Sequence, residues 1–143
     1  MNILYNHEGS EILCLSSLLF LIPIIYAFEN NLYLYSLFLS GILVTSFNFW
    51  RHPIYGIRRN MDLYYAKISF IISCIIYYIY CNNYESIFLT IFILSSILYN
   101  YYLSSYYYEK LDNKWIFHHA CFHASLVLQQ CIILYDIIHC KKN

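Results

Sequence analysis

The sequence predicts an all-α integral membrane protein, a bundle of about five transmembrane helices in which residues 1–143 form a single domain. Three observations predict this fold. The 143 residues are 61% hydrophobic and only 11% charged, whereas soluble domains carry about a quarter charged residues. Apolar runs near the length of about 20 residues that a helix needs to cross a bilayer recur five times. The connections are short, and with 3 Gly and 2 Pro long loops are not expected.

The five runs set the expected spans, which lie approximately at residues 11–28, 32–50, 63–81, 86–108 and 115–138. The first run could be a cleaved signal peptide, but it has neither a basic leader nor a small-x-small cleavage site, so we expect a retained helix. Pro23 should kink this helix, which a bundle tolerates because neighbouring helices satisfy the freed carbonyl group.

A soluble five-helix bundle is the competing interpretation. The second run contains no charged residue from Leu32 to Trp50. A helix that is apolar all round is either deeply buried or in lipid, and a chain this short cannot bury five such helices. The membrane interpretation is therefore preferred.

Lysine and arginine in the short connections predict the orientation. One side of the membrane would hold Arg51, Arg58, Arg59, Lys110 and Lys114, and the other side only Lys141 and Lys142. This asymmetry favours a cytoplasmic N-terminus and an external C-terminus, with an endomembrane such as the endoplasmic reticulum as a candidate location. Lys67, one turn into the third expected span, should snorkel toward the basic side.

Charge and cysteine content narrow the class of function. Eight basic and eight acidic side chains cancel, so no net charge favours a nucleic-acid partner. The six cysteines include no C-x-x-C pair and mostly lie in apolar runs, which argues against a structural zinc site. The oligomeric state is left open by the sequence.

An odd number of crossings gathers polar side chains at one face of the membrane. The end of the second span, the start of the third and the start of the fifth share that face, which brings Ser46, Asn48, Asp62, His119 and His123 to a similar depth. Polar and ionisable groups in spans are costly and usually face the bundle interior. We therefore expect these side chains to meet.

His119 and His123 are four residues apart and lie one turn apart on one helix face. This spacing lets two imidazoles reach one metal ion, as in other helical two-histidine sites. Gln130 would line the same cavity, whereas His118 points away by about 100°.

Each residue also has a simpler interpretation. Histidines at the start of a helix need no ligand, Asp62 could cap the third helix, and Ser46 could bond its own helix carbonyl. The segment RHPIYGIRR could be only a basic anchor beside anionic headgroups.

The combination of Ser46 late in the second span, Asp62 at the third and HHACFHASLVLQQ in the last resembles the CREST superfamily. This superfamily groups alkaline ceramidases, progestin/adipoQ receptors and Per1-like proteins. Members usually have seven spans, and loss of one pair would keep the serine, aspartate and histidines on one face. The family takes its third zinc histidine from one turn after the serine, where this chain has Trp50. His52 is the nearest substitute, with His7 and Asn48 as further candidates.

The resemblance implies a zinc-dependent hydrolase that acts on an amide bond of a lipid substrate in the bilayer. Zinc would be held by His119, His123 and His52, and would activate a bound water. Asp62 would be the general base, and Ser46 would orient the water or stabilise the oxyanion. At the lipid headgroup, a phosphate or carboxylate would be bound by Arg58 and Arg59.

Two rival functions remain. One is a non-catalytic, small multi-pass protein that binds lipid or a membrane partner. The other is a proton or ion pathway, ranked last because the polar residues concentrate at one side apart from Gln129, Gln130 and Asp136. We interpret Asp136, with His139 and Cys140, as an interfacial helix end.

Overall fold

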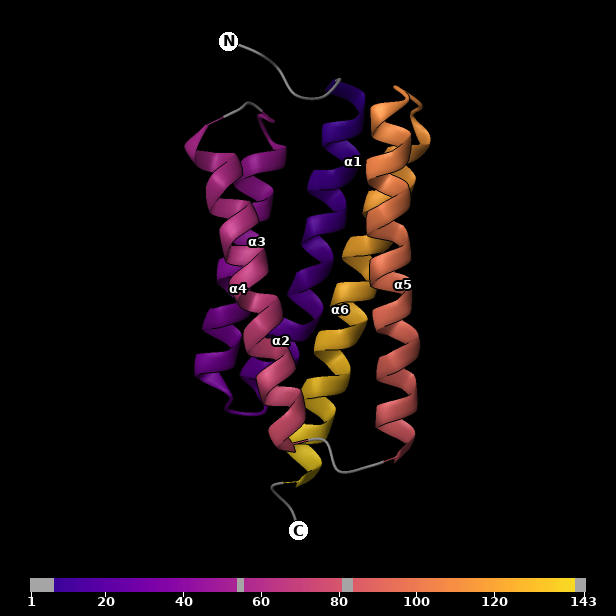
Figure 1. Ribbon diagram of the computed structural model, residues 1–143. Helices are drawn as coiled ribbons and strands as arrows, with labels where there is room; N and C mark the ends of the chain where they lie inside the picture. The colour runs from indigo at the N-terminus through magenta and orange to yellow at the C-terminus, as the bar shows by residue number, and fades with distance from the viewer. Residues whose placement is uncertain (1–6, 54–55, 81–83, 141–143) are drawn as a thin grey trace.

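Apolar helices account for most of the chain in the computed structural model, which describes residues 7–53, 56–80 and 84–140 (without the side chains of residues 7, 8, 85 and 140). The helices are α1 (His7–Ser17), the short 3₁₀ helix η1 (Leu18–Phe20), α2 (Leu21–Glu29), α3 (Tyr33–Trp50), α4 (Ile57–Tyr80), α5 (Tyr84–Glu109) and α6 (Lys114–Cys140). They run up and down beside one another (Figure 1).

The expected all-α bundle is confirmed, and five described segments are long and apolar enough to cross a membrane. They are Gly9–Glu29, Tyr33–Trp50, Ile57–Tyr80, Ser86–Glu109 and Lys114–His139. This composition is compatible with a multi-pass integral membrane protein.

The first span is continuous in direction but changes helix type near its middle. Proline has no N–H group and its ring clashes with the carbonyl four residues earlier, which for Pro23 is that of Leu19. The backbone tightens into the 3₁₀ turn Leu18–Phe20 just before this proline. The irregularity expected at Pro23 therefore lies three residues ahead of it.

The two described tight turns between helices use a residue with positive φ. Asn31 follows α2 with φ 59°, and the amide of Leu32 donates to the carbonyl of Ala27 at 2.9 Å. Leu111 follows α5 with φ 56°, and the amide of Asp112 donates to Tyr107 O at 3.0 Å. This is the usual left-handed ending of a helix, and it lets antiparallel neighbours follow at once.

Helix α4 begins earlier than the sequence predicted. It starts at Ile57, whereas the expected third span started at residue 63, because Arg58, Arg59, Asn60 and Asp62 made this segment resemble a loop. Asp62 is thus the sixth residue of the helix, and the interpretation that it caps the helix is wrong. Lys67 also lies deeper in the span than expected.

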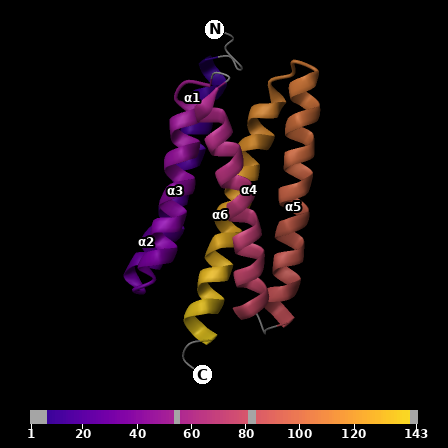
Figure 2. The ribbon, with the colours of Figure 1, turned by 60° about the vertical axis from the view of Figure 1, so that its left-hand side comes forward.

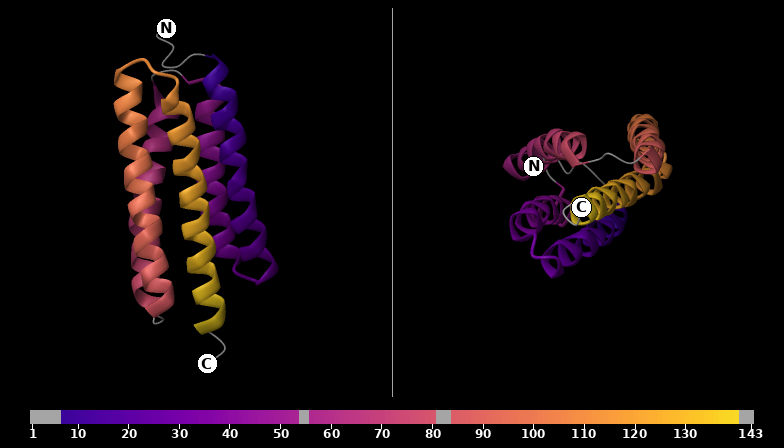
Figure 3. Two further views of the ribbon diagram at one scale, coloured as in Figure 1. Left: turned by 90° about the vertical axis from the view of Figure 1, so that its right-hand side faces the viewer. Right: turned by 90° about the horizontal axis from the view of Figure 1, so that it is seen from below.

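The last helix is the centre of the bundle. Helix α6 packs against α1, α2, α4 and α5, and α3 packs against α1, α2 and α4. Helix α5 packs closely only against α6 among the described elements, and its backbone does not approach that of α4 although the two helices are consecutive in the chain. Figure 2 and the view from below in Figure 3 show α4 and α5 as separate rods beside α6.

A ladder of polar contacts holds α5 to α6. In order from the C-terminal to the N-terminal end of α5, the pairs are Ser104–His119 at 3.2 Å, Asn100–His118 at 3.1 Å, Ser96–Ser125 at 3.0 Å, Thr90–Gln129 at 3.5 Å and Ser86–Asp136 at 2.9 Å. In lipid such bonds stabilise helix pairs because no water is available as a partner. Buried polar groups thus line α6 over most of its length, not at one side only.

Asp136 does not behave as an interfacial residue. Its side chain is only 7% exposed, and its Oδ1 accepts a hydrogen bond from Ser86. The interpretation of this residue as part of an exposed helix end is therefore wrong. His139, in contrast, is exposed and its Nδ1 lies 2.7 Å from the carbonyl of Tyr135.

Candidate functional site

The two histidines of the H-x-x-x-H motif face the interior of the bundle. His119 and His123 lie on one face of α6, with ring centroids 4.9 Å apart and planes at 75°. His123 is only 4% exposed, and His119 is partly buried. The pairing that the spacing predicted is therefore present, and neither ring is turned out toward lipid.

Ser16 of α1 fixes the orientation of His123. The serine Oγ lies 2.7 Å from Nδ1 of His123 and donates to the carbonyl oxygen of Leu13 at 3.0 Å. A hydroxyl has one hydrogen, so both bonds form together when Nδ1 of His123 is the donor. That tautomer leaves the lone pair of the ring on Nε2.

His119 is enclosed by aromatic rings. The ring centroid of Trp50 lies 4.9 Å from that of His119, in an edge-on arrangement, and the ring of Trp115 lies at 6.5 Å. The two indoles stack at 6.3 Å on each other within a core cluster that includes Leu13 and Phe49. Trp50, one turn after Ser46, thus lies against the histidine pair.

Ser46 and Asp62 meet on the neighbouring side of this region. Ser46 is 5% exposed, and its hydroxyl lies close to the Asp62 carboxyl group. Its Oγ also lies 3.2 Å from Oγ of Ser17. Ser46 therefore bonds across helices, which differs from the simpler interpretation of a bond to its own helix.

Two consecutive serines of α1 connect the two halves of the site. Ser16 bonds His123, and Ser17 bonds Ser46. The imidazole of His123 and the hydroxyl of Ser46 are thus linked through Ser16, Ser17 and the carbonyl oxygen of Leu13, to which both serines donate. Ser16, Ser17 and Ser104 were not predicted from the sequence, in which the only signal was a Ser-Ser pair inside an apolar run.

The other candidate metal ligands that the structure describes, His52 and Asn48, lie apart from His119 and His123. His52 is exposed in the turn after α3, where its amide donates to Phe49 O at 3.1 Å. Asn48 is partly buried, and its Oδ1 accepts a bond of 3.5 Å from Arg51. The side chain of His7, another candidate ligand, lies outside the described residues.

Gln130 belongs to a second polar layer, lower in the bundle. Its Oε1 accepts a hydrogen bond from the hydroxyl of Tyr35 at 2.7 Å, and its Nε2 donates to Ser73 at 3.0 Å. This amide joins α3, α4 and α6 and does not line a cavity shared with the histidines. Arg58 and Arg59 lie in the first turn of α4, both partly buried, four and three residues before Asp62.

A zinc ion of the catalytic kind requires three protein ligands and an open position for water. Among the described residues there is no group of three or more His, Cys, Asp or Glu side chains that could hold a metal ion. The indole of Trp50 occupies the place beside His119 and offers no lone pair for a metal. The described residues do not fit such an ion, and zinc stays a prediction from the resemblance.

A pocket lies apart from the histidine pair. It has a volume of about 330 Å³ between α3 and α4, and it is lined by Thr45, Ile57, Asn60, Met61, Tyr64, Tyr65 and Ile68. None of these residues belongs to the candidate site.

Comparisons of the chain with protein-family models, with curated proteins and with solved structures find no match.

Proposed function

We propose that this chain is a non-catalytic, multi-pass membrane protein that acts by binding another component of the bilayer, with its buried histidines in a structural role. The observation that carries the proposal is the packing of Trp50 against His119. An indole in this place fills the space and supplies no ligand. The histidine pair is then part of the packing between helices.

The hydrogen bonds of the pair agree with a structural role. Nδ1 of His123 bonds α1 through Ser16, and Nδ1 of His119 lies 3.2 Å from Oγ of Ser104 in α5. Buried polar groups in lipid need partners, and bonds of this kind hold membrane helices together. The two imidazoles thereby join α6 to a helix on each side.

A zinc-dependent lipid amide hydrolase of the CREST type is the second candidate. It is favoured by the contact between Ser46 and Asp62, the two residues to which the resemblance assigns the water and the base. It is also favoured by the tautomer that leaves Nε2 of His123 free to accept. This candidate requires a third metal ligand from outside the described residues.

The metal content of the purified protein separates the two candidates. We expect no stoichiometric zinc in the wild-type chain and no change in His119→Ala or His123→Ala. His139→Ala, at the exposed opposite end of α6, is the matched control. One zinc ion per chain that is lost in both variants and kept in the control would instead establish the hydrolase site, and release of a fatty acid from a ceramide would then be measured.

A further inference from the structure

Helix α4 carries a lysine far inside its apolar span. Lys67 lies ten residues after Ile57, which at 1.5 Å per residue is about 15 Å along the axis. Two residues earlier, the hydroxyl of Tyr65 donates to Phe38 O at 3.1 Å. Lys67 is the eleventh of the 24 residues of α4, so its backbone lies near the middle of that helix.

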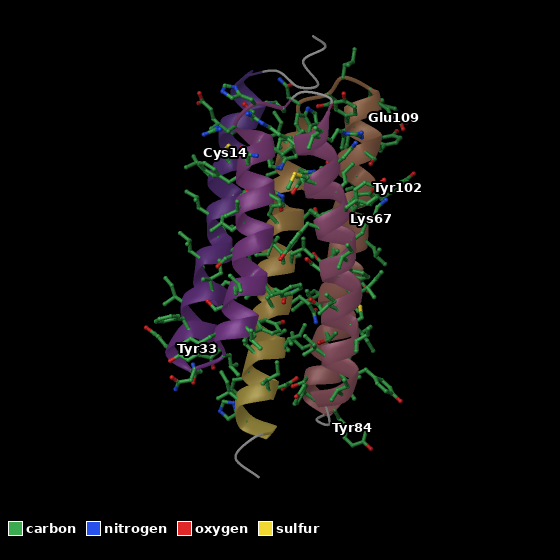
Figure 4. The ribbon with its side chains drawn as sticks, turned by 90° about the vertical axis from the view of Figure 1, so that its left-hand side faces the viewer. Cys14, Tyr33, Lys67, Tyr84, Tyr102 and Glu109 are labelled. Carbon is green, nitrogen blue, oxygen red and sulfur yellow. The ribbon has the colours of Figure 1, made fainter. Side chains whose placement is uncertain are left out.

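The side chain of Lys67 is exposed on the surface of the bundle; Figure 4 shows this lysine part-way between the two ends of the helices. The nearer end of α4, at Ile57, is about 15 Å away along the helix axis, and the four-carbon stem of lysine covers only part of this distance. A lysine at the centre of a membrane helix costs about 2.5–3.5 kcal/mol when it has no partner.

The residues around Lys67 form one helix face, which we call the Lys67 face. It consists of Leu63, Lys67, Phe70 and Cys74, spaced by four, three and four residues, and all four are exposed. This spacing defines a single stripe along a helix. Ala66 beside it is also exposed, and small residues let a second helix approach closely.

The described part of the chain leaves the Lys67 face uncovered. Helix α5 follows α4 in sequence but packs closely only against α6 among the described elements. In an apolar 18-residue stretch of α4 only 11% of the residues are buried, against 50% in that of α6. Most of α4 is exposed, and the charge of Lys67 singles out the Lys67 face among its exposed faces as the one that another helix is to cover.

A second copy of this chain does not supply the counter-charge. Within the described spans, Asp62 is partly buried close to Ser46, and Asp136 is buried against Ser86. Glu11, Glu29 and Glu109 lie at the ends of their spans. An exposed carboxylate at the depth of Lys67 is absent from the described part of the chain, so a different chain must provide it.

We infer that the Lys67 face binds a membrane-spanning helix of another protein that carries an aspartate or glutamate near its centre. The inference rests on the proposed binding function and names the kind of partner. The pair would form a charge-assisted hydrogen bond in a medium without water, where such bonds are strong.

A synthetic helix tests this inference. The full chain, with a donor fluorophore at its N-terminus, is placed in phosphatidylcholine vesicles with an acceptor-labelled Leu/Ala helix of about 24 residues that has aspartate at its centre. We expect energy transfer above the random level for the wild type and for Lys67→Arg. Association should fall about tenfold for Lys67→Met, in line with the strength of polar contacts between membrane helices.

Charge reversal and a matched lysine provide the controls. Lys67→Asp should bind a helix with central lysine and not one with central aspartate. Lys114→Met, at an exposed lysine 3.6 Å from Asp112, should bind like the wild type. Equal energy transfer for helices with central aspartate and central leucine, or for wild type and Lys67→Met, overturns the inference and leaves Lys67 as a lysine that snorkels to lipid headgroups.

Different results would overturn the proposed non-catalytic function and the inference about Lys67. Absence of helix binding in a chain that also lacks zinc overturns the inference about Lys67 and leaves the non-catalytic proposal standing. Stoichiometric zinc held by His119 and His123 overturns the non-catalytic proposal, whatever the synthetic helix does.

Discussion

Nδ1 of His123 lies 2.7 Å from Oγ of Ser16, so the first and last helices are joined by a hydrogen bond inside the bundle. These residues are 107 positions apart in sequence, and both are buried. Because the neighbouring Ser17 bonds Ser46, one turn of α1 connects α6 to α3. The polar side chains that the crossing pattern gathers at one level therefore meet through serines of the first helix.

Removal of this bond should reduce stability by a measurable amount. We expect Ser16→Ala to lower the free energy of unfolding by about 0.6–2 kcal/mol, the range found for hydrogen bonds between membrane helices. The measurement is unfolding by SDS in mixed micelles. In a double-mutant cycle with His123→Ala, the two losses should be non-additive because one bond is removed in both variants.

Ser95→Ala is the matched control for that cycle, because Ser95 is exposed and bonds only the carbonyl of Ile91 in its own helix. It should leave stability unchanged. Strict additivity of Ser16→Ala and His123→Ala would mean that the two side chains do not interact.

Gly41 allows α3 and α4 to approach through Tyr65. A Cβ atom on Gly41 would overlap the hydroxyl oxygen and the ring of Tyr65, which donates to Phe38 O. We expect Gly41→Ala to destabilise the bundle by about 1–3 kcal/mol, the usual cost of overpacking, as measured by the same unfolding titration. In a Tyr65→Ala background the added methyl group should cost much less; an equal cost in both backgrounds would contradict this contact.

The sequence predicted the helices well because apolar length is a local property. The five expected spans correspond to five observed ones, and the largest difference is the start of α4 at Ile57. There, Arg58, Arg59 and Asp62 suggested a loop, although long basic side chains can extend a helix beyond the hydrocarbon. Chain parity alone brought Ser46, Asp62 and the histidines to one level.

The contacts within the candidate site could not be predicted in the same way. Which side chain lies beside a histidine depends on the rotation of each helix about its axis, and apolar runs without a polar face leave this rotation undefined. Ser16 and Ser17 were therefore missed. The sequence identified Trp50 as a departure from the CREST pattern but did not predict that its ring packs against His119.

Asp136 should stabilise the pairing of α5 with α6. Its Oδ1 accepts a bond of 2.9 Å from Ser86, and α5 has no other helix partner among the described elements. We expect Asp136→Asn to retain most of the stability because the amide oxygen also accepts, and Asp136→Ala to lose about 1 kcal/mol. Ser86→Ala should lose a similar amount. Equal loss in Asp136→Asn and Asp136→Ala would indicate that the negative charge, not the accepted bond, matters.

The orientation of the chain in the membrane is predicted from the basic residues at the end of the bundle where α1 begins. The start of α1 lies at the same end of the bundle as the ends of α3 and α5, and the end of α6 lies at the other (Figure 1). We expect an N-terminal epitope tag to be cytoplasmic and a C-terminal tag to be protected from protease in intact membranes. Combined Arg51→Gln, Arg58→Gln and Arg59→Gln should give a mixed orientation, because basic residues near span ends set the topology. A protected N-terminal tag in the wild type would reverse the assignment.

Replacement of Trp50 by histidine should convert the pair into a three-histidine metal site. The Trp50 ring lies 4.9 Å from that of His119, which in turn lies 4.9 Å from that of His123. We expect Trp50→His to bind one zinc ion per chain, because three imidazoles with an open fourth position form a usual zinc site. Trp50→Phe keeps an aromatic ring without a ligand and should bind none, which separates metal binding from loss of packing. Because zinc binds only neutral imidazoles, occupancy in Trp50→His should fall in acid. Absence of zinc in a folded Trp50→His chain would show that the three rings do not converge on one point.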